Sequence, residues 1–269
     1  MTLPPSAPGP DRVKEAVRGN FDVSVEAYDA FEEEHGLFAG LTRHLAGIAG
    51  IREGMSVCDV GCGSGASTAV LSGIVGPEGW VIGIDISEAM LRAAEARPTP
   101  HTNCCYLAAD ATDVRDIEGG LDAVLYNASI FLVPDPAAAL AAARDALVPG
   151  GVVGMDFLDG LRRTVDAIDP FEEARRVRAP NAPYGRRIMD PTTIPDILKD
   201  LGFRDVTEGH HEVPMTRHQA IGFYSIPAQS AGQWPRTPYE ERMGMLGEIL
   251  GHEDDAAFVQ GWGWVLGGR

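Results

Sequence analysis

The sequence predicts an α/β fold built on a doubly wound, mostly parallel sheet of seven strands. Short apolar runs alternate with helical segments along most of the 269 residues, a pattern typical of strands joined by crossover helices on both faces of a sheet. The first core run, 57–60, ends in a glycine-rich turn that leads into a helix, and polar side chains end the next three runs. Because ligands bind at the carboxyl ends of such strands, one cleft is expected to collect these residues.

The segment before the sheet is expected to be helical. Residues 1–10 hold four prolines and are predicted to form a disordered tail. Apolar residues then recur at steps of three and four positions through 11–50, which predicts an N-terminal helical cap.

The predicted core spans residues 51–213, where strands alternate with helices. Its strands are expected at 57–60, 80–85, 104–109, 121–126, 151–158 and 203–213. Its helices are expected at 64–75, after Ser87, at 136–147 and at 192–201.

The last part of the chain is predicted to add a lid and a final strand. Residues 214–255 are rich in glycine, proline and aromatic residues, with one helix expected near 239–250. Long excursions of this kind often close over a site, so this range is predicted to be a lid inserted before the last strand. Trp262 and Trp264 recur at period two within 256–269, which predicts the closing strand of the core.

The glycine-rich turn carries the strongest functional signal. Gly61, Gly63 and Gly65 follow the first core strand at alternate positions, and glycine lets a ligand approach the backbone closely. The helix that follows directs its free N–H groups at the turn. Asp59 would repel a pyrophosphate there but would suit an amine or a sulfonium. The pattern Gly61-x-Gly63-x-x-Ala66 also fits a looser dinucleotide fingerprint, which leaves a nicotinamide-dependent oxidoreductase as an alternative.

Three more polar side chains end the following runs. Asp85 ends the second run, at the distance where an acid meets ribose hydroxyls in such folds. Asp110 ends the third run and Asn127 ends the fourth. With the glycine turn, these residues are expected to line one cleft.

This ordered set resembles the class I S-adenosylmethionine-dependent methyltransferases, and in particular the small-molecule branch with the ubiquinone and menaquinone C-methyltransferases. The resemblance covers residues 20–212 and the C-terminal strand, and it implies that this last strand runs antiparallel to the others. It implies S-adenosyl-L-methionine as cofactor and methyl transfer to an O, N or C nucleophile of a small molecule. A fold-alike that binds this cofactor without methylating, such as a cyclase, stays open as an alternative.

The resemblance also implies roles at the methionine end of the cofactor. The turn 61–65, with Cys62 as a small filler, would carry the methionine portion, and Asp59 would lie near its amino group. Asn127 would lie beneath the sulfonium. Tyr28 would fold over this end and help to close the site.

The same resemblance implies roles at the nucleoside end. Asp85 would accept both ribose hydroxyls, while Ile86 and Met90 would flank the adenine. Asp110 would take the adenine amine, and Ala111 would give a backbone contact.

A general base is the least determined part of the site. His211, on the sixth predicted strand, is the preferred candidate. The alternatives are His210, His218, His35 and His44, and an electron-rich carbon nucleophile needs no strong base.

Composition excludes several partners and chemistries. A net charge of −17 argues against nucleic acid and against an anionic membrane surface. Lys14 and Lys199 are the only lysines, which disfavours Schiff-base chemistry and the Tyr-x-x-x-Lys pair of short-chain dehydrogenases.

Cysteine spacing and hydropathy bear on metal, membrane and compartment. The four cysteines lack paired C-x-x-C spacing and are interpreted as reduced thiols, so no metal site is predicted. No apolar run approaches the ~20 residues of a membrane span. The chain is therefore predicted to be soluble and cytoplasmic, with a small-molecule substrate; its oligomeric state cannot be predicted from the sequence.

Overall fold

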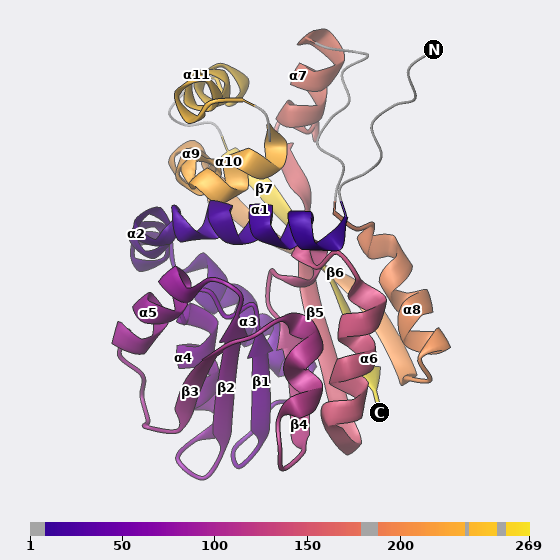
Figure 1. Ribbon diagram of the computed structural model, residues 1–269. Coiled ribbons are helices and arrows are strands. Elements are labelled where there is room, and N and C mark those ends of the chain that lie inside the picture. Colours follow the sequence, from indigo (N-terminus) through magenta and orange to yellow (C-terminus); the bar gives the residue numbers. More distant parts are fainter. Residues whose placement is uncertain (1–8, 179–187, 235–236, 252–256) are drawn as a thin grey trace.

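A twisted sheet of seven strands organises the protein, as Figure 1 shows for this computed structural model, which describes residues 9–178, 188–234, 237–251 and 257–269. The strand order is β3-β2-β1-β4-β5-β7-β6. The strands are β1 (Ser56–Val60), β2 (Trp80–Asp85), β3 (Cys104–Ala108), β4 (Leu121–Tyr126), β5 (Leu147–Arg163), β6 (Arg204–Thr216) and β7 (Ala257–Gly268). Strands β1 to β5 pair in parallel, whereas β7 runs antiparallel to both β5 and β6. The predicted fold class is confirmed, including the antiparallel last strand.

Helices precede, connect and follow these strands. The N-terminal helices are α1 (Pro10–Asp22), α2 (Val25–His35) and α3 (Leu37–Ile48). The connecting helices are α4 (Ala66–Val75), α5 (Glu88–Ala96), η1 (Ala111–Asp116), η2 (Ile130–Leu132), α6 (Pro136–Ala146), α7 (Pro170–Arg178), η3 (Pro191–Thr193) and α8 (Ile194–Asp200). Between β6 and β7 lie α9 (Arg217–Ser225), α10 (Pro227–Gln233) and α11 (Tyr239–Ile249). None of the helices in the described residues has the length and apolar composition needed to cross a membrane.

Helices cover the sheet on both faces because its strands alternate their side chains between two cores. Val57 on β1 packs into a cluster with residues of α3 and α4, including Leu45 and Leu71. Its neighbour Cys58 points into the opposite cluster, which includes Leu140 on α6. This period-two alternation gives β1 a buried side chain on each face, as expected for a central parallel strand.

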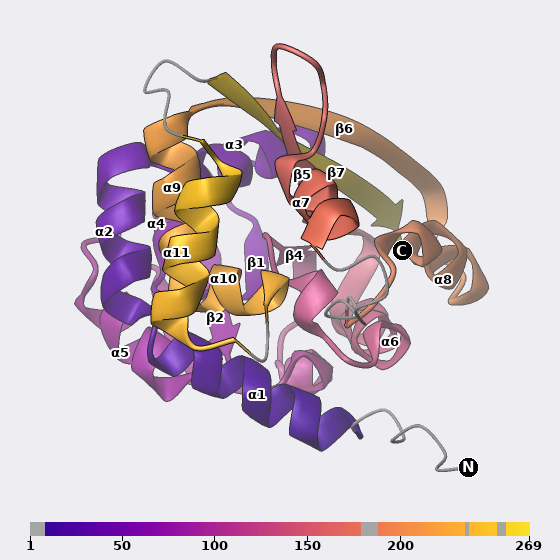
Figure 2. The same cartoon turned by 90° about the horizontal axis from the view of Figure 1, so that it is seen from above.

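The strand order reverses at β1, which pairs with β2 on one side and with β4 on the other. At such a reversal, the chain leaves neighbouring strands toward opposite faces and opens a crevice at their carboxyl ends. Helix α1 lies across this end of the molecule, between the core and the helices α9 and α10 (Figures 1 and 2).

A third apolar cluster joins the N-terminal helices to the segment between β6 and β7. Phe31 on α2 contacts Phe223 on α9 edge-to-face, with ring centroids 5.8 Å apart. Leu161 on β5 and Trp262 on β7 are buried in the same cluster. The extended ends of these two strands therefore carry the added helices.

The structure corrects several predicted boundaries. Helix α1 begins at Pro10, and residues 1–8 of the predicted tail lie outside the described residues. Strand β6 continues to Thr216, three residues beyond 213, and the parts of the predicted lid at 235–236 and 252–255 are also outside the described residues. Where one helix was predicted within 214–255, the described part of this range contains three, because α9 and α10 are short and lack a long apolar repeat.

Candidate active site

A cavity of about 1020 Å³, including its open mouth, lies at the carboxyl ends of β1 to β4. Its floor is formed by the residues that follow these four strands, at 61–64, 85–86, 109–111 and 127–129. Its roof comes from Lys14, Val17 and Phe21 on α1 and from Tyr28 and Glu32 on α2. The strand tips named from the sequence are therefore brought together in one place.

The three glycines of the turn have different surroundings. All have positive φ, at +73° for Gly61, +54° for Gly63 and +83° for Gly65, a region that only glycine adopts freely. A Cβ on Gly61 would lie 2.5 Å from the Cβ of Ser129, so this glycine lets the turn after β4 pack against β1. A Cβ on Gly63 would meet nothing within 4 Å.

Gly65, which the sequence predicts as a cofactor contact, is not among the described residues that line the cavity. A Cβ there would lie 2.9 Å from both the Ala94 Cβ and the Tyr106 hydroxyl, so Gly65 allows α4 to start against α5 and β3. Gly61, Cys62 and Gly63 do line the cavity, and burial raises the pKa of the Cys62 thiol, which keeps it neutral.

Asp59 also lies elsewhere than predicted. Its side chain is fully buried beneath the turn and is not among those lining the cavity. Its Oδ2 accepts hydrogen bonds from the hydroxyls of Ser67 and Thr68 on α4, while Oδ1 is buried without a partner. Burial raises the pKa of Asp59 to about 6, against the two hydroxyl hydrogen bonds, which lower it. Period-two alternation places this carboxyl on the α4 face of β1.

Asp85 lies at the cavity and fixes the shape of the glycine turn. Its Oδ2 accepts the Gly63 N–H at 2.9 Å, and its Oδ1 accepts the Ser87 N–H at 2.8 Å. Burial raises the pKa of this carboxyl, against the backbone hydrogen bonds that lower it. A carboxylate has about four lone-pair sites, so each oxygen retains room for one more donor.

The side chains predicted near the adenine also line the cavity. Ile86 follows Asp85 directly, and Met90 is fully buried in the first turns of α5. Ala111 begins η1, whose N-terminus is capped by Asp110.

Asp110 is already paired with the roof. Its Oδ2 lies 2.7 Å from Lys14 Nζ, and its Oδ1 accepts hydrogen bonds from the Thr112 N–H and hydroxyl. Partial burial acts to raise the pKa of Asp110, but the Lys14 and Thr112 contacts outweigh it and hold this pKa below its usual value. Helix α1 is thus tied to the loop after β3.

The turn after β4 forms the floor beside the glycines. Asn127 donates from Nδ2 to the Thr42 hydroxyl at 2.8 Å, and its Oδ1 is buried without a partner. Ala128 has φ of +51°, and the buried Asp156 carboxylate accepts its N–H. Burial raises the pKa of Asp156 to about 7. A strained backbone held by a buried carboxyl is a typical feature of a functional turn.

Tyr28 lines the cavity from α2. Its ring stacks on Phe38 with centroids 4.8 Å apart, and its hydroxyl accepts a hydrogen bond from Gln229 Nε2 at 2.9 Å. Burial raises the pKa of this phenol, so it stays neutral and keeps its proton. Gln229 belongs to α10, so the segment predicted to be a lid supports the roof through this contact, and none of its described residues lines the cavity.

The preferred general base is not at the cavity. His211 lies on β6, which is separated from the strands of the site by β7 and β5, and its ring stacks on His44 of α3 with centroids 4.2 Å apart. None of the described residues that line the cavity is a histidine. The structure therefore does not support His211 as a group that contacts substrate, because sheet order placed it on the far edge.

Sequence reasoning missed the roof residues of α1 and one acid of α2. Lys14, Val17 and Phe21 lie three and four positions apart, the spacing of one helical face. Glu32 lies four positions after Tyr28 on the same face of α2. Its carboxylate accepts the N–H groups of Phe38 and Ala39 at the start of α3, and burial raises its pKa. The helical spacing was the available signal in both cases.

Comparison with known proteins assigns this site to a family. A nocamycin O-methyltransferase from Saccharothrix syringae is 32% identical to the chain over 217 residues, which cover 72% of this chain and 75% of that protein. The chain belongs to the class I S-adenosylmethionine-dependent methyltransferases. Residues 57–151, from β1 to the start of β5, match the family described as "Methyltransferase domain".

Other relatives agree with this assignment. A demethylmenaquinone methyltransferase of Staphylococcus aureus (strain JH9) is 36% identical over 104 residues, 39% of this chain and 43% of that protein. The solved structure of phosphoethanolamine N-methyltransferase 2 from Haemonchus contortus with S-adenosyl-L-methionine has a TM-score of 0.58 at 16% identity, covering 99% of this chain and 61% of that one. At that identity the likeness shows the fold alone. The protein is a methyltransferase that acts on small molecules, and S-adenosyl-L-methionine is the methyl donor of its family.

The different environments of Gly63 and Gly65 lead to a stability prediction. Gly65→Ala combines left-handed backbone strain with overpacking against Ala94, so the free energy of unfolding is expected to fall by about 2–4 kcal/mol. Gly63→Ala has the strain alone and is expected to lose about 1–2 kcal/mol. Urea denaturation of both variants without cofactor measures this, and equal losses would contradict the packing role of Gly65.

Asp59 leads to a pH prediction. Its folded-state pKa of about 6 lies above the ordinary 3.8, so its contribution to stability is fully present below about pH 4 and is lost as pH rises through about 6. In Asp59→Asn this titration is absent. The free energy of unfolding of the wild type, minus that of the variant, is therefore expected to fall between these pH values and to stay level above them. Urea melts across this range give the difference, and parallel curves would show that Asp59 does not titrate there.

Proposed function

We propose that this methyltransferase methylates an oxygen of a small, mostly apolar acceptor whose hydroxyl is already acidic, such as an enol or a phenol. The observation that carries this proposal is the lining of the cavity. Apart from the polar groups assigned to the cofactor it is largely apolar, and its described residues include no histidine and no carboxyl without a hydrogen-bond or ion-pair partner. The named activity of the Saccharothrix relative, an O-methyltransferase, supports transfer to oxygen.

The nucleoside end suits adenosine. We assign the ribose hydroxyls to Asp85, because each of its oxygens accepts one backbone N–H and retains room for a second donor. Ile86 and the buried Met90 offer apolar contact to the two faces of a purine. Asp110 lies at the outer edge, where a purine amine would join Lys14 on the same carboxylate.

The other end suits a cation. When bound, S-adenosylmethionine would supply a methyl group on a sulfonium. The nucleophile would attack the methyl carbon in line with the C–S bond, and the sulfur would leave as a neutral thioether. Glu32 places a buried carboxyl here, Tyr28 and Phe38 place aromatic faces, and Asn127 Oδ1 is a buried acceptor without a partner. Acidic, aromatic and carbonyl groups all stabilise positive charge. Gly63 leaves the open space that lets a methionine chain pass close to the turn.

The acceptor side is apolar. Val17 and Phe21 on α1 and the segment Leu132–Pro134 add apolar side chains to the cavity lining. These side chains exclude water and position a flat or branched apolar molecule against the methyl group.

The carboxyl groups of the cavity already have hydrogen-bond or ion-pair partners, and no histidine is among its described lining residues. Glu32 accepts two backbone N–H groups, Asp85 accepts two, and Asp110 is paired with Lys14. Tyr28 is a neutral phenol and can donate a hydrogen bond but cannot remove a proton. This arrangement favours an oxygen nucleophile that ionises through the acidity of the acceptor itself, which an enol or phenol has and a simple alcohol lacks.

We also infer that the methyl acceptor is not a nucleic acid and that the enzyme works in a reducing compartment. The net charge of −17 would repel a phosphate backbone. All four cysteines are free thiols, which supports the prediction of a cytoplasmic protein.

Methyl transfer from labelled S-adenosylmethionine to matched acceptors tests the proposal. The panel pairs cyclic enols and phenols with the corresponding saturated alcohols and amines of equal size. Labelled product is expected from the acidic hydroxyl compounds, with a rate that rises as the acceptor ionises. Transfer only to nitrogen or carbon, or equal rates for saturated alcohols, would overturn it.

The role of Asp85 is tested separately by binding. Asp85→Ala removes hydrogen bonds to a charged acceptor, each worth about 1.5–3 kcal/mol, so the Kd for S-adenosylhomocysteine is expected to rise by about 10-fold or more. Glu78→Gln, in the exposed turn before β2 at the opposite end of the sheet, serves as the charge-matched control and is expected to bind normally. Isothermal titration calorimetry on both variants measures this, and unchanged affinity in Asp85→Ala would exclude Asp85 from the ribose site.

A further inference from the structure

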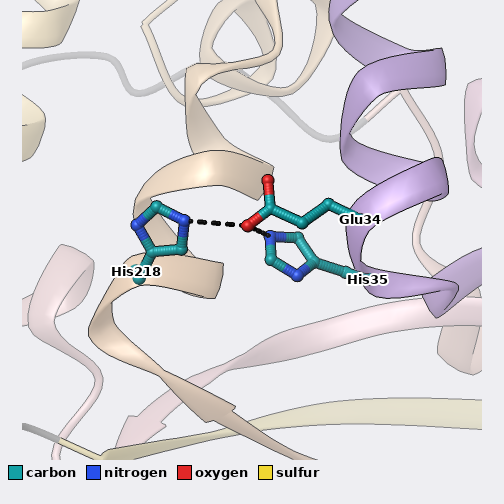
Figure 3. A group of neighbouring side chains, drawn as sticks. All are labelled: Glu34, His35 and His218. Carbon is teal, nitrogen blue, oxygen red and sulfur yellow. Dashed lines mark hydrogen bonds and ion pairs between the residues drawn. The ribbon is translucent and has the colours of Figure 1, made fainter.

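Two histidines and a glutamate meet on the side of the molecule away from the cavity floor, between α2 and α9 (Figure 3). His218 Nε2 lies 3.2 Å from Glu34 Oε1, and His35 Nε2 lies 3.7 Å from the same oxygen. The three ligand atoms all lie within 4.8 Å of one another. Glu34 and His218 are 184 positions apart in the chain, so only the fold brings them together.

These distances are short enough for the three groups to bind one small divalent ion. A tetrahedral zinc with bonds of about 2.0–2.1 Å holds its ligand atoms roughly 3.3 Å apart. Two of the three separations here are 3.2 and 3.7 Å. Two imidazoles with one carboxylate form a ligand set used by zinc and its d-block neighbours, whereas calcium and magnesium prefer oxygen ligands alone.

One ligand is held in place and the other two can adjust. The His35 side chain is 10% exposed and packs edge-to-face on Phe31 with centroids 4.8 Å apart. Gly222 on α9 leaves room for the Phe31 ring on which His35 packs, since a Cβ there would lie 3.2 Å from Phe31 Cδ2. The side chains of His218 and Glu34 are 76% and 60% exposed, so a rotation of each can close the shell without moving the backbone.

We propose that Glu34, His35 and His218 form a zinc-binding site, with water completing the coordination. The position in the fold gives the ion a structural role. Helix α2 carries Tyr28 and Glu32, which line the cavity, and α9 belongs to the segment that supports α2. The ion joins these two helices and so holds α2, which forms part of the roof of the cofactor cavity, against α9.

Zinc titration of the untagged, full-length protein tests the proposal. One equivalent of Zn²⁺ is expected to bind, with a rise in the thermal midpoint at saturating metal, and Mg²⁺ at the same concentration is expected to have no effect. His218→Ala is expected to weaken zinc binding at least tenfold and to remove the thermal shift. This exposed position leaves the apolar core intact, so the variant is expected to fold.

Matched variants separate the site from other zinc ligands. His35→Ala and Glu34→Ala are each expected to weaken binding, while His101→Ala, a histidine in the turn before β3, is expected to bind zinc as the wild type does. Absence of one-equivalent binding by the wild type would overturn the proposal. So would binding that persists in His218→Ala, which would place the metal elsewhere on the protein, or an equal loss in His101→Ala.

Discussion

The close contact between Gly61 and Ser129 joins the two strands at which the sheet order reverses. The Ser129 hydroxyl donates to the Val60 carbonyl at the tip of β1, and the missing side chain at Gly61 provides the space. A side chain at position 61 would push the turn after β4 away from β1. The cavity floor depends on this approach, because Gly63 and Asn127 then lie on the two sides of one crevice. Asp85 adds a second tie by accepting the Gly63 N–H from the neighbouring strand.

Charge in the site is arranged to favour a cation without providing a free base. Glu32, Asp85 and Asp110 surround the cavity, and each is hydrogen-bonded to backbone or paired with Lys14. Beneath the turn, Asp59 adds a buried acid held by two hydroxyls. Groups held in this way stabilise positive charge on the ligand, so positioning, charge stabilisation and water exclusion are the main contributions of the protein.

Most of the fold could be predicted because it depends on local pattern. Buried parallel strands are short apolar runs, and the turn at Gly61 marks the end of β1 while the turn at Gly76 marks the end of α4. The strand tips and the residues that follow them are therefore predictable. The direction of individual side chains was less so. Asp59 and Gly65 lie in or next to the glycine-rich turn, as predicted from the sequence. However, the Asp59 side chain points beneath the turn, and Gly65 packs against Ala94.

The remaining differences come from long-range geometry, which a single sequence does not contain. The sequence alone does not show that β6, which carries the predicted general base His211, lies at the edge of the sheet. There the His211 ring stacks on His44. The meeting of His35 with His218 depends on how α9 packs on α2, and neither helix alone indicates it. Short helices such as α9 and α10 have too few turns for a clear apolar repeat.

Two contacts fasten α1 to the loops around the nucleoside end: Lys14 to Asp110, and the Ser87 hydroxyl to Asp22. The nucleoside end of the cavity therefore lies under a thirteen-residue helix that is held to the loop after β3 and to the turn after β2. Breaking these two contacts would widen the mouth of the cavity. The exchange of spent for fresh cofactor is therefore expected to depend on how firmly α1 is held.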